Sequence, residues 1–330
     1  MIKTVTPAGL EERFTEPEGF RFHSFEREGR KIRFGSVSPK DSIPDAVVVC
    51  LPGLSEPIEK YFETARDLLD KNFSVWVIDW MGQGGSGRYL DNPHKRHNAN
   101  FDEDVEDLHY LILEYIKHAS VHPDKGRIPM AMLSHSMGGN IGLKYLEKHT
   151  DVFECAGFSA PLLGIPGISN IPEAILLPLA KVFANTVGKS YAKGQKDWSP
   201  ITRREPLGEG EFSSDPVRDG LHREWLSANP ELQIGGVTYR WVYEALKSCK
   251  HAKEAADNVQ TPSLIAIAGK DTIVDNSKIK AMPNSKMLEL ATAKHEILME
   301  TDDIRNAFFD SFFELIQENI LDKPETLRPF

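Results

Sequence analysis

Short runs of apolar residues recur along the chain and are separated by longer segments that mix apolar and polar positions. Runs of this length with almost no polar residue are typical of strands that helices cover on both faces, and such strands form parallel sheets. They lie at residues 46–51, 73–79, 128–133, 154–160, 262–268 and 286–291. Two earlier segments, residues 20–27 and 31–37, flank a turn at Gly29 and predict an antiparallel hairpin. The pattern therefore predicts an α/β fold, with a mostly parallel, doubly wound sheet behind an antiparallel N-terminal hairpin.

Amphipathic helices are predicted between these strands. The clearest covers residues 101–117, where apolar residues recur at spacings of three and four. Asn100 is suited to be its N-cap, and Glu103 stands where a capping box places its acidic residue. A last helix is predicted at residues 302–319.

One long interval lacks strong strand patterns. Residues 163–255 are rich in proline and hold three of the five tryptophans, which predicts an inserted, mainly helical cap. We therefore expect a first core part at residues 1–162, the cap at 163–255 and a second core part at 256–330. The charges of the cap nearly cancel, whereas the whole chain has a net charge of −10.

Net charge and cysteine content limit the expected partners and the expected cellular compartment. A net charge of −10 gives no basic footprint, so no nucleic-acid partner is expected. Three cysteines, an odd number, argue against a disulfide framework and favour a reducing compartment. The N-terminus lacks the apolar core of a secretory signal, and no apolar run is long enough to span a bilayer. We expect a cytoplasmic protein, with weak peripheral contact to the inner membrane through the apolar stretch at residues 171–183 of the cap.

A candidate nucleophile lies where an apolar strand runs into SHSMGG (134–139) and an amphipathic helix follows at once. This strand, turn and helix are the context of a nucleophile elbow, in which a serine sits on a strained turn above the sheet. Ser134 replaces the first glycine of the usual pattern, which is a sterically mild change. The segment predicts Ser136 as a catalytic nucleophile.

A serine nucleophile needs a general base and an acid that orients the base. Asp271 comes just after the strand at 262–268, and His295 comes just after the strand at 286–291. Reactive groups gather at the carboxyl ends of parallel strands, so both residues are candidates. Asp275 is an alternative acid, and we favour Asp271 because it directly follows the strand end.

Two backbone N–H groups are the usual donors to the oxyanion in acyl transfer. Met137 follows the nucleophile and supplies one. The loop LPGLSE (51–56) follows the first buried strand, and its glycine allows the backbone to approach the site. The simplest second donor is Leu54.

These motifs together resemble the α/β-hydrolase superfamily, and most closely its bacterial lysophospholipase and monoacylglycerol lipase branch. The resemblance is carried by PG (52–53), DWMGQGGSGR (79–88), SHSMGG (134–139), NPELQIGGVTYRWVYEAL (229–246), AGKDTIVDN (268–276) and KHEILMETDDIR (294–305). It implies the α/β-hydrolase fold, a triad of Ser136, Asp271 and His295, and a cap over an acyl pocket. Pro52 stands where the family often has histidine, and Met81 where it often has arginine, which bears on the orientation and head group of the substrate.

We therefore expect a serine ester hydrolase that works through an acyl-enzyme on a small amphiphilic ester. The apolar content of the cap, together with the resemblance, favours a monoacyl lipid, either a lysophospholipid or a monoacylglycerol. An aminopeptidase or a small-ester carboxylesterase on the same triad remains an alternative. An aminopeptidase needs an acid for the substrate amine, and the cap offers Glu205, Glu209, Glu211 and Asp215. A non-enzymatic binding protein is disfavoured because all three triad residues are present in order.

No cofactor and no metal are expected. His94 and His97 resemble a metal pair, but no cluster of further ligands completes it, so a solvated loop is the simpler interpretation. The glycines of MGQGGSG (81–87) fit neither a phosphate-binding loop nor a dinucleotide fingerprint, and we assign this segment no chemistry. Six aromatic residues of the cap could line an acyl pocket or pack a small core: Trp198, Phe212, Trp225, Tyr239, Trp241 and Tyr243.

Overall fold

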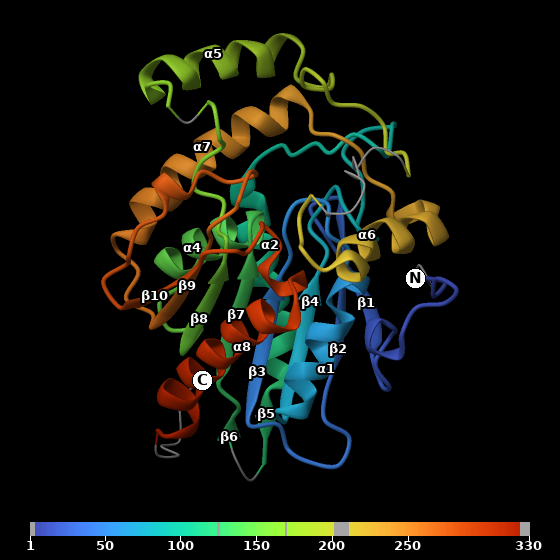
Figure 1. The fold of residues 1–330 in the computed structure, drawn as a ribbon, viewed down its shortest axis with the longest axis vertical. Coiled ribbons are helices and arrows are strands. Elements are labelled where there is room, and N and C mark those ends of the chain that lie inside the picture. Colours follow the sequence, from blue (N-terminus) through green and yellow to red (C-terminus); the bar gives the residue numbers. More distant parts are fainter. Residues whose placement is uncertain (1–3, 124–125, 169, 201–210, 324–330) are drawn as a thin grey trace.

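A computed structural model describes residues 4–123, 126–168, 170–200 and 211–323. Its centre is an eight-stranded sheet in the order β1-β2-β4-β3-β7-β8-β9-β10 (Figure 1). The strands are β1 (Arg21–Arg27), β2 (Arg30–Val37), β3 (Ala46–Leu51), β4 (Phe73–Ile78), β7 (Met130–His135), β8 (Cys155–Ser159), β9 (Ser263–Ala268) and β10 (Ser285–Leu290). β2 pairs antiparallel with β1 and β4, and all the other neighbours are parallel. The predicted fold class, including the N-terminal hairpin, is confirmed.

One strand differs from its prediction. β10 lies at the edge of the sheet, where Met287 is 41% exposed, although its sequence pattern was interpreted as burial on both faces. An edge strand has a neighbour on one side only, and the charged residues Lys286 and Glu289 in this run suit that position. A separate two-stranded ribbon, β5 (Val121–His122) and β6 (Gly126–Arg127), lies outside the sheet.

Helices cover both faces of the sheet (Figure 1). α1 (Phe62–Asp70) and α8 (Asp302–Ile316) share one face and are joined by a hydrogen bond from Arg305 to Asp67. The other face carries α2 (Phe101–Leu111), α4 (Met137–Lys148) and part of α7 (Tyr239–Ala256). The remaining helical segments are α3 (Lys117–Ala119), π-helical turns at Ile112–Ile116 and Gln317–Leu321, and 3-10 turns at Glu12–Phe14, Ile58–Tyr61, Pro230–Leu232, Asn276–Lys278 and Ile297–Met299.

The start of α2 confirms one predicted cap and corrects another. The Asn100 side chain accepts a hydrogen bond from the Asp102 N–H, as an N-cap does. The Asn100 N–H, however, donates to Asn98 Oδ1 at 3.0 Å, so the capping box expected from Glu103 does not form. Glu103 accepts a hydrogen bond from the Tyr89 hydroxyl instead.

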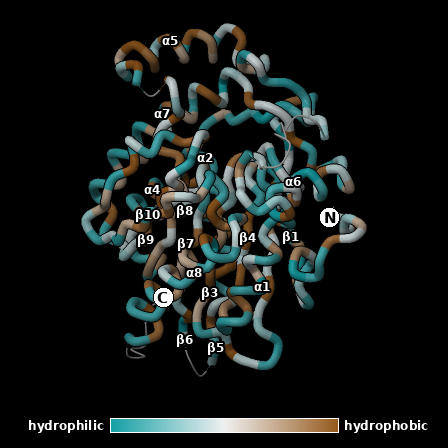
Figure 2. Tube along the Cα trace, in the orientation of Figure 1, coloured by the Kyte–Doolittle hydropathy of each residue, from teal (hydrophilic) through white to brown (hydrophobic). Residues whose placement is uncertain are grey.

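The chain between β8 and β9 rises above the carboxyl ends of the strands (Figure 1). It contains α5 (Glu173–Thr186), α6 (Pro216–Ala228) and α7, and α5 packs along α7. The rings of Phe183 and Tyr239 stack between them at 5.2 Å. Apolar residues are concentrated in the central strands and again along α5 (Figure 2). Within the described parts of the chain, no helix combines the length and apolarity that a membrane crossing requires.

Candidate active site

Ser136 occupies a strained turn between β7 and α4. Its φ of 49° and ψ of −114° lie in a region that non-glycine residues rarely adopt. Gly138 lets α4 start here, because a Cβ atom at this position would lie 2.1 Å from the Leu51 carbonyl oxygen. Ser134, in place of a glycine, donates a hydrogen bond to the Gly157 carbonyl at 3.0 Å, so its buried hydroxyl has a partner. The turn therefore has the strained geometry expected of a nucleophile elbow.

The structure brings Ser136, His295 and Asp271 together. His295 Nε2 lies 2.9 Å from Ser136 Oγ, and His295 Nδ1 lies 2.7 Å from Asp271 Oδ2. The other oxygen of Asp271 accepts the N–H groups of Ile273 and Val274. Asp275 does not take this place, since its Oδ1 accepts hydrogen bonds from Ser277 at the start of a 3-10 turn.

The surroundings keep Asp271 charged and His135 neutral. Burial acts to raise the pKa of Asp271, but the contact with His295 and two backbone N–H groups outweigh it and hold this pKa below its ordinary value. Burial lowers the pKa of His135 to about 4. The ring of His135 lies 4.8 Å from that of His295, so a neutral His135 adds no like charge beside the candidate base.

The loop after β3 lies beside the serine turn and leaves one backbone N–H without an acceptor among the described residues. Gly53 packs against the serine turn, because a Cβ atom there would lie 3.2 Å from Ser136 Cβ. Gly53 N–H donates to Glu56 Oε2 at 2.6 Å, and Ser55 N–H donates to Gln83 Oε1 at 3.0 Å. Within the described chain the Leu54 N–H has no acceptor, and Met137, the first residue of α4, has none within its helix. Both N–H groups predicted as oxyanion donors are therefore available.

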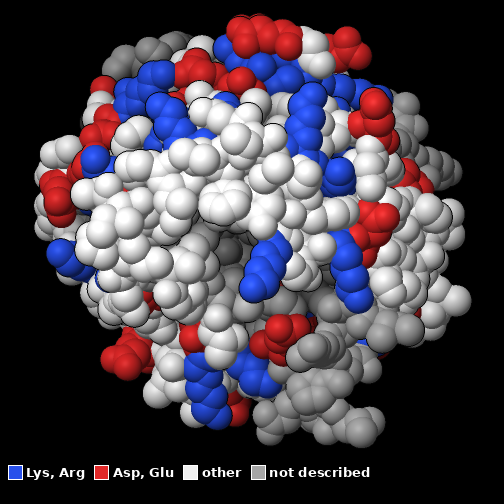
Figure 3. Space-filling model, turned by 90° about the horizontal axis from the view of Figure 1, so that it is seen from above, with Lys and Arg blue, Asp and Glu red and all other residues white. Residues whose placement is uncertain are grey.

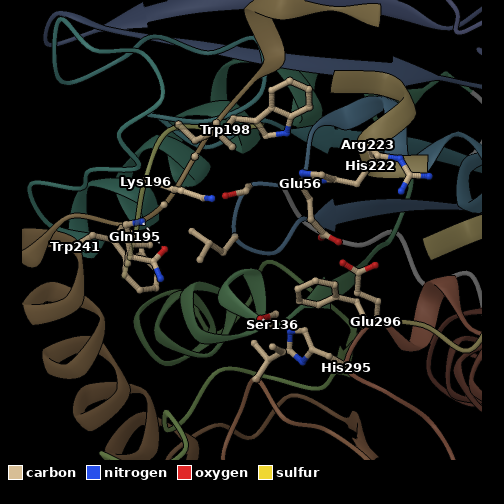
Figure 4. A pocket seen from close by; sticks show the side chains of 18 of the residues that line it. Glu56, Ser136, Gln195, Lys196, Trp198, His222, Arg223, Trp241, His295 and Glu296 are labelled. Carbon is tan, nitrogen blue, oxygen red and sulfur yellow. Dashed lines mark hydrogen bonds between the residues drawn. The ribbon is translucent and has the colours of Figure 1, made fainter. Parts of the chain in front are cut away.

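Ser136 and His295 open into a cavity of about 520 Å³ beneath the chain between β8 and β9 (Figure 4). This volume lies within the usual range for small-molecule sites. The apolar part of its wall is formed by Leu54, Leu162, Ile165, Trp198, Phe212, Ile234, Val237, Trp241 and Ile273, and the charged part by Glu56, Lys196, Asp197, Arg223 and Glu296. More of this wall is apolar than polar. Of its charged residues Glu56 and Glu296 are buried, and Lys196 and Asp197 are exposed.

The six aromatic candidates of the cap divide between pocket and core. Trp198, Phe212 and Trp241 line the cavity. Trp225 is buried against Phe62, with the two rings in an edge-to-face contact at 5.5 Å. The other two lie along α7, where Tyr239 stacks on Phe183 and Tyr243 lies under the guanidinium of Arg240.

A buried ion network at the cavity wall has no counterpart among the residues predicted from the sequence. Lys60 is 1% exposed, and its ammonium lies 2.7 Å from Glu56 and 2.6 Å from Glu296. Burial acts to raise the pKa of Glu56, but the Lys60 ammonium and the Gly53 N–H hold this pKa well below its usual range. The i, i+4 spacing of Glu56 and Lys60 was the available signal, although the same spacing is common on solvated helices.

The interpretation of His97 as part of a solvated loop is wrong. Its ring is buried, and Nδ1 lies 2.9 Å from Oγ1 of Thr238, the N-cap of α7. The sequence around His97 predicts an exposed side chain because its neighbours in the chain are polar. In the fold, however, residues 94–97 run beside residues 235–238 and are covered by them.

A mostly parallel sheet with an antiparallel start, and a serine turn between β7 and α4, define an α/β-hydrolase. Residues 42–302 match the model of the hydrolase family described as serine aminopeptidase, S33, so the chain belongs to that family. The chain is 30% identical over 276 residues to lysophospholipase L2 of Escherichia coli K12, a match that covers 79% of this chain and 77% of the relative. It is 28% identical over 161 residues to a monoacylglycerol lipase of Mycolicibacterium smegmatis, covering 48% and 54% of the two chains.

Solved structures agree with this fold. A soluble variant of monoglyceride lipase from Saccharomyces cerevisiae superposes with a TM-score of 0.69 at 16% identity, over 95% of this chain and all of that one. A carboxyl esterase from Bacillus coagulans gives a TM-score of 0.69 at 18% identity, over 92% of this chain and all of that one. By these relationships the chain is a carboxylic ester hydrolase in the lysophospholipase and monoacylglycerol lipase branch of the α/β-hydrolases.

Proposed function

We propose that the chain hydrolyses the ester bond of a monoacyl lipid, a lysophospholipid or a monoacylglycerol, through a serine acyl-enzyme. The observation that carries this proposal is the hydrogen-bonded series from Ser136 through His295 to Asp271, which opens into a mainly apolar cavity. A single acyl chain fits such a wall, and the exposed Lys196 and Asp197 suit a polar head group. The relatives named for lysophospholipid and monoacylglycerol support the same substrate class.

In the proposed mechanism, Ser136 Oγ attacks the ester carbonyl while His295 Nε2 takes its proton. Asp271 holds Nδ1–H and stabilises the imidazolium that forms. The N–H groups of Leu54 and Met137 donate to the oxyanion of the tetrahedral intermediate. His295 then returns the proton to the departing alcohol, and a water molecule, activated by the same imidazole, releases the fatty acid.

The aminopeptidase alternative finds less support at the site. Of the four acids considered for the substrate amine, Glu205 and Glu209 lie outside the described residues. Asp215 instead caps α6 and pairs with Arg218 at 3.0 Å. Glu211 is exposed and is not among the residues that line the cavity. An ester therefore suits the described site better than a peptide.

A substrate panel separates these functions. We expect kcat/KM for a long-chain monoacylglycerol and a lysophospholipid to exceed that for a two-carbon aryl ester by about tenfold or more, since a few buried methylenes give this much. We expect no measurable release from aminoacyl-arylamides. The measurement is initial rates on purified protein below the micellar concentration of each lipid. Faster turnover of the short ester or the arylamide would contradict the lipid assignment and leave the serine mechanism standing.

We also propose that α5 contacts a lipid surface. Ile175, Leu179 and Val182 recur along it at helical spacing and are 60%, 53% and 58% exposed. Lys181 lies between them, and further exposed lysines follow along the chain. Seen from above, basic side chains stand around a broad uncharged area of the surface (Figure 3). An exposed apolar stripe beside lysines fits an anionic bilayer, whose head groups attract the lysines as its acyl region takes up the apolar side chains.

We expect the triple variant Ile175→Ser, Leu179→Ser, Val182→Ser to bind anionic vesicles at least about tenfold more weakly than the wild type, since each apolar side chain contributes on the order of 1 kcal/mol. Co-sedimentation at low salt measures this. The matched control carries Val121→Ser and Met287→Ser, which remove exposed apolar residues from β5 and β10. Equal vesicle binding by the wild type, the triple variant and the control would show that α5 does not contact the lipid surface.

A further inference from the structure

Gln83 lies between two glycines in the turn after β4, and its buried amide is fully engaged by the loop that carries Leu54. Gln83 Nε2 donates to the carbonyl oxygens of Gly53 at 2.8 Å and Glu56 at 3.0 Å. Gln83 Oε1 accepts the N–H of Ser55 at 3.0 Å. With the Gly53 N–H bound by the Glu56 carboxylate, this pattern commits every backbone N–H from residue 53 to residue 56 except that of Leu54.

The loop needs this support because its conformation is strained. Ser55 has a φ of 65°, a left-handed value that costs a non-glycine residue on the order of 1 kcal/mol. Trp80 anchors the loop from the same turn, since its indole N–H donates to the Pro52 carbonyl at 2.8 Å. We expect loss of these hydrogen bonds to let the loop relax and the Leu54 N–H to change its direction.

Arg96 fixes which way round the Gln83 amide sits. Its Nε–H donates to Gln83 Oε1 at 3.2 Å, and a guanidinium can only donate, so the amide oxygen must face it. Arg96 is itself held by the carbonyl oxygens of Met81 and His97. Its backbone pairs with Gly236 and Thr238, beside residues that line the cavity. The cavity wall is therefore joined through Arg96 and Gln83 to the loop at residues 51–56, called the oxyanion loop below.

We propose that Gln83 is a positioning residue that preorganises the oxyanion hole, with Arg96 fixing the orientation of its amide. The role rests on the proposed function, because it presumes that Leu54 donates to an oxyanion. Neither residue touches the substrate, and the effect is exerted through the Leu54 N–H. Donors fixed in advance stabilise the transition state without reorganisation, and misplacement by about 1 Å can cost about 100-fold in rate.

The test compares Gln83→Leu with the wild type on a short aryl ester, which does not depend on the lipid assignment. We expect kcat/KM to fall about 100-fold with KM nearly unchanged. A trifluoromethyl ketone forms a tetrahedral hemiketal with Ser136 and places an oxyanion in the hole, so its affinity should fall by a similar factor. Affinity for the alcohol product, which has no carbonyl oxygen to place in the hole, should stay the same.

The matched control is Asn98→Leu. This amide is also fully buried and hydrogen-bonded, to Asp104 and the Asn100 N–H, but it does not touch the oxyanion loop. We expect Asn98→Leu to lower the thermal midpoint without a selective loss of ketone affinity. Arg96→Lys keeps the charge and removes the Nε–H donor, and should cost about tenfold in kcat. It also tests the proposal if Gln83→Leu does not fold.

The outcomes distinguish a failure of the positioning role from a failure of the proposed function. If Gln83→Leu and Arg96→Lys bind the trifluoromethyl ketone as the wild type does, the positioning role is wrong. An equal loss in Asn98→Leu also overturns it, because the effect is then one of general stability. A wild-type protein that binds no trifluoromethyl ketone and hydrolyses no ester contradicts the proposed function itself.

Discussion

Replacing Ser136 by alanine is expected to lower kcat for ester hydrolysis by about five to six orders of magnitude. The loss is this large because His295 then has no hydroxyl to deprotonate, and the covalent path through the acyl-enzyme is closed. Residual turnover would come from water within a site whose oxyanion donors remain in place. The measurement is the steady-state rate on a saturating aryl ester, together with labelling by a fluorophosphonate, which should be absent from the variant.

Ser134→Ala is the matched control for this result. Ser134 lies two residues earlier, and its hydroxyl bonds to the Gly157 carbonyl within the sheet rather than facing His295. Its loss should change kcat by no more than about threefold, since a single neutral hydrogen bond in the sheet contributes on the order of 1 kcal/mol, mainly to stability. Substantial hydrolysis by Ser136→Ala, at a level that a contaminant cannot supply, would disprove the serine mechanism.

Asp271→Asn is expected to lower kcat by about four orders of magnitude while the fold is kept. An amide can donate to His295 Nδ1 and so favours the tautomer that carries its proton on Nε2. That tautomer cannot accept the proton of Ser136. Because its pKa lies below the ordinary value, the Asp271 carboxylate stays charged from neutral pH down to below about pH 4. Loss of activity at higher pH than this therefore has another origin than protonation of Asp271.

Asp275→Asn distinguishes the two acids that the sequence offers. Its Oδ1 accepts hydrogen bonds from Ser277, and an asparagine oxygen can accept the same bonds, so we expect kcat within about threefold of the wild type. Thermal unfolding of both variants checks that neither result reflects a lost fold. If Asp275→Asn carried the large defect and Asp271→Asn the small one, the assignment of the acid would be reversed.

The fold could be predicted because apolar runs mark strands that are buried on both faces. Residues 46–51 and 73–79 were located within one residue of β3 and β4. The predicted burial of β10 on both faces is wrong, because an apolar run does not say whether a strand has a second neighbour. Likewise, Asn98 rather than Glu103 completes the start of α2, since a side chain before the helix reaches the same N–H.

The residues of the candidate site could be predicted where they directly follow the ends of predicted strands in the expected order. Ser136, Asp271 and His295 follow strand ends that meet at one edge of the sheet, so sequence position implied their proximity. Gln83 carried no such signal. It lies 30 residues from Gly53, and its partners are mostly backbone atoms, which leave no trace in residue type. Buried networks of this kind depend on the register of packed loops rather than on any local pattern.

The insertion above the cavity connects two strands that lie side by side in the sheet. β8 ends at Ser159 and β9 begins at Ser263, and the two strands pair directly with each other. About a hundred residues therefore form one connection from the carboxyl end of β8 back to the amino end of β9. The entropy of closing such a loop rises only slowly with its length. Substitutions, deletions or a transplanted segment ahead of α7 can alter which molecules reach Ser136, while the elbow keeps its supports in β3 and β7 and α7 stays packed on α4. Members of the family can accordingly diverge in this insertion at little cost to the stability of the sheet.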